Sequence, residues 1–140
     1  MASLAVLLTT VAGFVVVTGS PAAAGSVHMH VYLSNIAGQG SATVSNSGVN
    51  TSYGITACDD RTDGHHVEAW LYRQAADIDD PDVLIAKAKA LGGSGTCTAV
   101  SGVKSGCTPT RAYTLRVLLM EGTQILDSDW SGYYWLSCPV

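Results

Sequence analysis

Two segments of the chain alternate apolar and polar residues, and this period of two constrains the fold most. Residues 27–33 (VHMHVYL) and 67–72 (VEAWLY) place an apolar side chain at every second position. Residues 113–120 (YTLRVLLM) are the most apolar segment with extended character. Successive side chains of a β-strand point to opposite faces, so we expect these segments to be strands with one buried face.

Turn-forming residues separate these segments, which predicts an all-β, mainly antiparallel domain. Several short strands with turns between them are typical of a small β sandwich or barrel. Residues 80–91 (DPDVLIAKAKAL) leave two interpretations open, because they combine helix start and stop signals with a strand-like alternation. One short helix near residues 81–91 is therefore retained as an alternative. Residues 92–110 are rich in Gly, Ser and Thr and are expected to be a flexible connection.

Residues 57–70 (ACDDRTDGHHVEAW) combine one cysteine, three aspartates and two histidines. Aspartate and glycine are typical turn formers, so we expect a hairpin loop of about five or six residues between two strands. A calcium loop that began at Asp59 would place Gly64 sixth, but Arg61 would be third and Trp70 twelfth, where oxygen ligands are required. The pattern therefore predicts a turn.

The N-terminal segment has the composition of a secretory signal peptide. Residues 4–17 (LAVLLTTVAGFVVV) are almost wholly apolar, and small residues precede the expected cleavage point after Ala24. This apolar core is too short to span a membrane comfortably. We therefore expect residues 1–24 to be removed and residues 25–140 to form a single secreted β domain, with no membrane contact afterwards.

All the cysteines lie in the expected exported segment: Cys58, Cys97, Cys107 and Cys138. An even number of cysteines in an oxidising compartment predicts two disulfides, but spacing alone leaves their pairing open. No pair has the CxxC spacing of many zinc sites. The formal net charge of −4 offers no electrostatic attraction for nucleic acid.

The sequence assigns no catalytic residue, no metal and no cofactor. It has no G-x-S-x-G nucleophile motif and no recognisable pair of catalytic carboxylates. His28 and His30 share one strand face, and His65 or His66 would have to join them to bind a metal, so these four are weak metal candidates. A small secreted hydrolase or metal-binding protein stays an alternative, but a noncatalytic protein is expected.

Aromatic residues concentrate near the C-terminus. We expect Trp130 to fill the core together with Trp70, because few other large apolar side chains are available. Tyr133, Tyr134 and Trp135 are left for either the core or contact with a glycan. A carbohydrate-binding module that acts on cell-wall or extracellular glycan is therefore an alternative function.

The first expected strand follows directly after the cleavage point. Such a strand can complete its own sheet or be added to the sheet of a partner protein. The candidate partner-binding residues are Val27, His28, Met29, His30, Val31, Tyr32 and Leu33.

Three quoted segments resemble a pattern found in small exported actinomycete proteins. They are residues 55–73 (ITACDDRTDGHHVEAWLYR), 92–97 (GGSGTC) and 115–130 (LRVLLMEGTQILDSDW). The resemblance covers about residues 49–130, with Leu118 where such proteins tend to carry a cysteine. The adaptor subunits of umbrella toxin particles, secreted antibacterial assemblies, belong to this group.

The resemblance implies a noncatalytic adaptor that links a lectin-bearing subunit to a large repeat-containing subunit of a toxin particle. Its expected partners are therefore other secreted protein subunits. The resemblance also implies that Cys58 pairs with Cys97, which would leave Cys107 and Cys138 for the second bridge.

Overall fold

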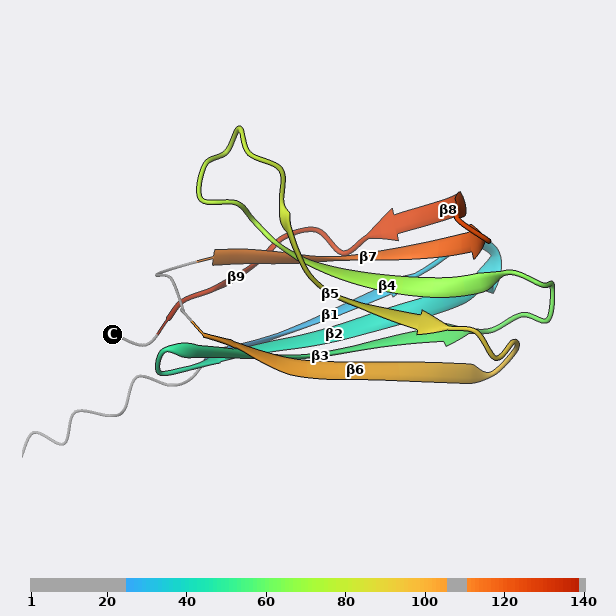
Figure 1. Cartoon of the computed structure of the whole chain (residues 1–140), viewed down its shortest axis with the longest axis horizontal. Helices are drawn as coiled ribbons and strands as arrows, with labels where there is room; N and C mark the ends of the chain where they lie inside the picture. Colours follow the sequence, from blue (N-terminus) through green and yellow to red (C-terminus); the bar gives the residue numbers. More distant parts are fainter. Residues whose placement is uncertain (1–24, 106–110, 139–140) are drawn as a thin grey trace, which may run out of the picture.

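The computed structural model describes residues 25–105 and 111–138, which form two antiparallel β-sheets (Figure 1). The first sheet has the order β1-β2-β3-β6, and the second has the order β5-β4-β7-β8, with β9 also paired to β7. The strands are β1 (Ser26–Tyr32), β2 (Gly38–Ser47), β3 (Asn50–Asp59), β4 (His66–Arg73), β5 (Val83–Ala90), β6 (Thr96–Ser105), β7 (Arg111–Glu121), β8 (Gln124–Trp130) and β9 (Tyr134–Leu136).

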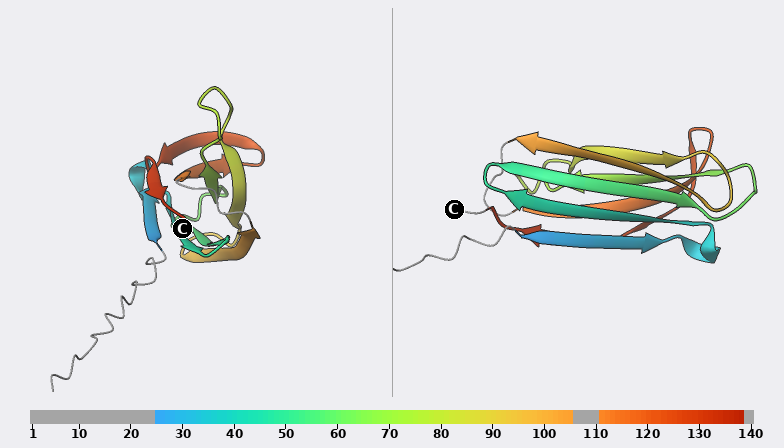
Figure 2. Two further views of the ribbon diagram at one scale, coloured as in Figure 1. Left: turned by 90° about the vertical axis from the view of Figure 1, so that its left-hand side faces the viewer. Right: turned by 90° about the horizontal axis from the view of Figure 1, so that it is seen from below.

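The two sheets lie face to face and do not close into a barrel, so the all-β, antiparallel prediction is confirmed as a β sandwich (Figure 2). The one helical element of the described residues is a 3-10 turn, η1 (Ser34–Ile36). No helix in this part of the chain is long and apolar enough to cross a bilayer. The expected signal peptide, residues 1–24, lies outside the described residues.

The core forms where the inner faces of the two sheets meet. Val44 and Ile55 of the first sheet and Leu71 and Leu115 of the second are almost completely buried. The sheets approach closely at Gly40 of β2, where an added Cβ would lie 2.5 Å from Cγ2 of Val117. The absence of a side chain at this position lets the two layers pack directly against each other.

Residues 83–90 form strand β5, so the alternative of a short helix near residues 81–91 is wrong. The local capping signals are outweighed by pairing, because β5 bonds along β4 from Val83 to Ala90 with one register shift. This pairing also places Ala88 and Ala90 in the core. Residues 83–90 therefore form a strand because the neighbouring strand β4 pairs with them.

Two further expectations about connections are wrong. The segment after β3 is not a hairpin loop, because β3 belongs to the first sheet and β4 to the second, so residues 60–65 cross from one sheet to the other. Residues 96–105, expected to be part of a flexible connection, form the ten-residue strand β6. Strand β6 pairs with β3 along its whole length, and this pairing overrides its glycine and serine content.

Candidate functional site

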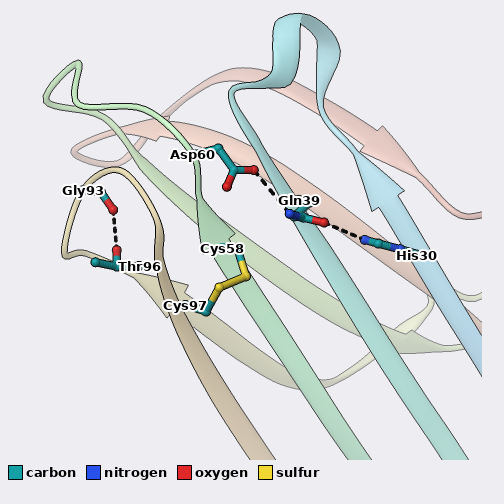
Figure 3. Close-up of a disulfide and its surroundings, with 7 residues drawn as sticks. All are labelled: His30, Gln39, Cys58, Asp60, Gly93, Thr96 and Cys97. Carbon is teal, nitrogen blue, oxygen red and sulfur yellow. Dashed lines mark hydrogen bonds between the residues drawn. A yellow bond between two sulfur atoms is a disulfide. The ribbon is translucent and has the colours of Figure 1, made fainter.

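A disulfide joins Cys58 of β3 to Cys97 of β6, which confirms the pairing that the resemblance implies (Figure 3). The two cysteines are directly opposite each other in the ladder, with their Cα atoms 4.1 Å apart. The bridge fixes the start of β6 next to the crossing segment of residues 60–65. Cys138 is also disulfide-bonded, whereas Cys107, the partner expected for it, lies outside the described residues.

The histidines of β1 take part in hydrogen bonds along the outer face of the first sheet. Nε2 of His30 lies 2.9 Å from Oε1 of Gln39, whose amide group donates to Oδ2 of Asp60 (Figure 3). Nδ1 of His28 lies 3.0 Å from the Thr43 hydroxyl. These two imidazoles therefore have local partners of their own.

The structure does not bring the four histidines together. His28 and His30 project from the outer face of the first sheet, whereas His66 lies on β4 of the second sheet and His65 in the crossing segment. His65 lies 3.1 Å from a carboxylate oxygen of Asp63. Among the described residues, no group of three metal-ligating side chains is close enough to hold an ion.

The outer face of the second sheet carries a row of alternating cations and indole rings. Lys87, Trp70, Arg116 and Trp130 occupy matched positions on β5, β4, β7 and β8. The ammonium group of Lys87 lies 3.7 Å from the Trp70 ring centroid, and the guanidinium carbon of Arg116 lies 5.0 Å from that of Trp130. Cation–π contacts of this kind contribute about 0.5–1 kcal/mol at exposed sites and more when desolvated.

Tyr72 connects the two indoles of this row. Its ring centroid lies 5.6 Å from that of Trp130 and 6.4 Å from that of Trp70. Desolvation raises the pKa of the Tyr72 hydroxyl, while the charge of Arg116 and a hydrogen bond from it act in the opposite direction. We call the six residues of this surface the aromatic–cation face: Glu68, Trp70, Tyr72, Lys87, Arg116 and Trp130.

The core assignments of Trp70 and Trp130 are therefore wrong. Trp70 is half-buried beneath Lys87, and Trp130 is 47% exposed. Both indoles lie on the outer side of the sheet because they share a face with Arg116 rather than with the inward-pointing Leu115.

Glu68 is the carboxylate that holds the face in position. One of its oxygens accepts a hydrogen bond of 2.7 Å from the Trp70 indole, and the other lies 3.1 Å from His66 and 3.5 Å from Lys89. Desolvation acts to raise the pKa of Glu68, but the hydrogen bonds from Trp70 and His66 and the charge of Lys89 hold it below the ordinary value. Glu68 therefore stays ionised and fixes the Trp70 ring.

Arg116 is held by its neighbours on three sides. Its Nη2 group donates a hydrogen bond of 3.0 Å to the Ser128 hydroxyl, and its Nε atom is buried with no hydrogen-bond partner in the described part of the chain.

Three of the seven Lys and Arg residues of this acidic protein, Lys87, Lys89 and Arg116, lie on this side of the second sheet. The surface is therefore locally basic and aromatic on a molecule with a net charge of −4.

The C-terminal aromatic residues lie near one end of the same sheet. Tyr133, Tyr134 and Trp135 are 54%, 39% and 61% exposed, so none of them fills the core. The Tyr133 hydroxyl donates a hydrogen bond of 2.7 Å to Oδ2 of Asp82, and this bond raises the pKa of Tyr133.

A cavity of about 400 Å³ lies at the end of the second sheet. Arg73 and Arg111 line it together with Asp80 and Pro81. Arg111 donates a hydrogen bond of 3.2 Å to the backbone carbonyl of Ala75, which ties β7 to the segment that follows β4. This cavity could not be predicted from sequence, because its lining comes from β4, β5, β7 and the segment between β4 and β5.

Strand β1, which carries the candidate partner-binding residues, pairs with β2 along all seven of its residues. Met29, Val31 and Leu33 are buried in the core, while His28, His30 and Tyr32 are exposed. The addition of this strand to a partner stays a prediction, and it would require β1 to leave its own sheet.

The fold and the site together define a disulfide-bonded β sandwich with an exposed aromatic and basic face on one sheet. No known protein family, no curated protein and no solved structure matches the chain.

Proposed function

We propose that this chain is a noncatalytic, secreted binding domain whose aromatic–cation face contacts a partner protein. The observation that carries the proposal is the row in which Lys87 and Arg116 alternate with Trp70 and Trp130 across four strands. Tryptophan, tyrosine and arginine are the residues that contribute most often to the energetic centre of protein interfaces.

The rigidity of this face supports a binding role. Trp70 is fixed by Glu68 and Lys87, and Trp130 is packed between Tyr72 and Arg116. Side chains that are already ordered lose little conformational entropy when a partner binds, so more of the contact energy appears as affinity. The disulfide supports export, because such bonds persist mainly in oxidising compartments.

The narrower proposal is that the domain is an adaptor that joins a lectin-bearing subunit to a repeat-containing subunit of an antibacterial toxin particle. Its support is the sequence resemblance together with the Cys58–Cys97 bridge that the resemblance implies. An adaptor needs two contact surfaces, and the exposed side of β1, with His28, His30 and Tyr32, is the proposed second one.

Glycan binding is the second candidate function, and three consecutive exposed aromatic residues favour it: Tyr133, Tyr134 and Trp135. Exposed rings with polar tips can stack on sugar rings while their polar groups form hydrogen bonds.

The two candidates are separated by native co-purification from the producing culture. A stable assembly with other secreted subunits, weakened by Trp130→Ala, is expected for the adaptor. A lone monomer that is retained on cell-wall glycan, and that loses this retention in Trp135→Ala, would contradict the protein-binding proposal.

A further inference from the structure

Strand β6 is the outer strand of the first sheet, and no strand lies beyond it in the described part of the chain. Eight of its ten residues are exposed, and Val103 is 63% exposed. A long edge strand of this kind presents unpaired amide and carbonyl groups that can bond to another strand.

The disulfide identifies which backbone groups of β6 point outward. Opposite residues of an antiparallel pair are about 4.5 Å apart when they are not hydrogen-bonded to each other and about 5.5 Å apart when they are. The Cα atoms of Cys58 and Cys97 are 4.1 Å apart, so these two residues form a pair that is not hydrogen-bonded to each other. Cys97 and every second residue after it, Ala99, Ser101 and Val103, therefore direct their N–H and C=O groups away from β3.

The opposite edge of the first sheet is covered at the point where the chain enters β1. The side chain of Leu136 on β9 lies so close to Gly25, just before β1, that an added Cβ there would be 2.7 Å from its Cδ1 atom. A further strand therefore has no open access to β1 at this end.

The edges of the second sheet carry features that oppose strand pairing. Strand β5 has a register shift, bears Lys87 and Lys89, and follows Pro81. Strand β8 has a register shift and bears Asp127 and Asp129. Bulges, charges and proline are common protections of edge strands.

Strand β6 has fewer of these protections. It pairs with β3 over ten residues without a register shift, it contains no proline, and Lys104 is its one charged residue. It is therefore the edge of this sandwich that is best suited to accept another strand.

We propose that β6 pairs in the antiparallel direction with β6 of a second copy of this chain, about a two-fold axis near Gly102. This register places Lys104 of one copy opposite Val100 of the other, so the two ammonium groups lie apart. It also joins the outer face of one copy to the outer face of the other, because Ser101 lies beside Val103 of the second copy on that face.

The occupant is a second copy because the strand is complementary to itself. Small side chains at Ala99, Ser101 and Gly102 let two identical strands approach without a steric clash. The pairing would join two four-stranded sheets into one continuous sheet. A two-fold contact occupies β6 of both copies, so it closes as a dimer and does not extend into a fibre.

Sedimentation velocity of the secreted chain, from about 1 μM to about 1 mM, tests the dimer over the range of weak to moderate affinities. We expect a concentration-dependent dimer in which the amides of Ala99, Ser101 and Val103 exchange slowly. Ser101→Pro removes an outward donor while the ladder to β3 stays intact, and it should raise the dissociation constant at least about tenfold. Ser101→Ala keeps the amide and should dimerise normally.

Val103→Lys provides a second variant that places a further charge at the edge without proline, and it should also weaken the dimer. Circular dichroism checks that both variants keep the fold. A wild-type chain that remains monomeric throughout would overturn the proposal. So would a dimer that folded Ser101→Pro and Val103→Lys proteins retain but Trp130→Ala loses, because that result would assign self-association to the aromatic–cation face.

Discussion

The guanidinium carbon of Arg116 lies 5.0 Å from the ring centroid of Trp130 on the neighbouring strand. The same guanidinium group donates to Ser128 and lies beside Tyr72, so one cation orders an indole and a phenol at the same time. This contact repeats the relationship between Lys87 and Trp70 on the other side of the row. The outer surface of the second sheet is thus organised by its own side chains before any partner binds.

The Lys87–Trp70 contact should be measurable as a coupling energy. A double-mutant cycle with Lys87→Ala and Trp70→Ala is expected to give about 0.5–1 kcal/mol, the range for exposed cation–π pairs. Lys87→Arg should retain most of this coupling. Urea unfolding of the four proteins of the cycle provides the measurement, and a coupling of zero would mean that the ammonium group does not hold the ring.

The ionisation of Glu68 should make stability depend on pH. Its pKa is lower in the folded protein than its ordinary value of 4.5, so its stabilising effect is complete above that pH and is lost as the pH falls through the folded-state pKa. The free energy of unfolding should therefore fall more steeply below pH 4.5 in the wild type than in Glu68→Gln. Parallel curves of unfolding free energy against pH for the two proteins would exclude a stabilising role for the Glu68 carboxylate.

The bridge between Cys58 and Cys97 should stabilise the domain. It joins residues that are 39 positions apart, and the loop-closure entropy of such a bridge corresponds to about 4 kcal/mol. The double variant Cys58→Ala/Cys97→Ala should lose about 3–4 kcal/mol in urea unfolding. An unchanged midpoint would show that the β3–β6 ladder needs no covalent support.

Gly40 should not tolerate a side chain. A Cβ at this position would lie 2.5 Å from Cγ2 of Val117 and 3.1 Å from Cβ of Ala69, so the two sheets would have to separate. Gly40→Ala should destabilise the protein by about 1–3 kcal/mol, as overpacking of a core does. Gly54→Ala is the matched control, because no atom lies within 4 Å of an added Cβ at that position.

The strands with a clear period of two could be predicted from sequence. Strands β1 and β4 contain the two segments in which apolar residues alternate, β7 contains the most apolar one, and the inner faces of all three contribute to the core. Strand β6 could not be identified in this way, because its stability comes from pairing with β3 and from the bridge at Cys97 rather than from local composition.

The aromatic–cation face could not be predicted from sequence, because the size of Trp70 and Trp130 indicates that they fill the core. The alternation of residues 67–72 already placed Trp70 with Glu68 and Tyr72, opposite to the core-facing Val67 and Leu71. The expectation that large aromatic residues fill the core predicts the inner face for Trp70 instead. The partners of Trp70 on β5 and β7 could not be read from sequence, because they depend on the register between strands.

The connection after β3 shows a similar limit. Aspartate and glycine in residues 60–65 correctly indicated the end of a strand, but turn chemistry does not determine which sheet receives the next strand. The crossing places His66 on the second sheet, whereas the histidines of β1 lie on the first.

Binding through the aromatic–cation face is tested most directly by comparing the capture of secreted subunits by three immobilised proteins: the wild type, Trp130→Ala and Tyr32→Ala. Trp130 and Tyr32 are both exposed aromatic residues, but they lie on the outer faces of opposite sheets. Binding through the aromatic–cation face predicts that Trp130→Ala loses at least about tenfold in affinity for the captured subunit, as expected for an aromatic residue at an interface centre. It also predicts that Tyr32→Ala binds that subunit as the wild type does. Equal binding by the wild type and a folded Trp130→Ala protein would show that the aromatic–cation face does not bind this subunit.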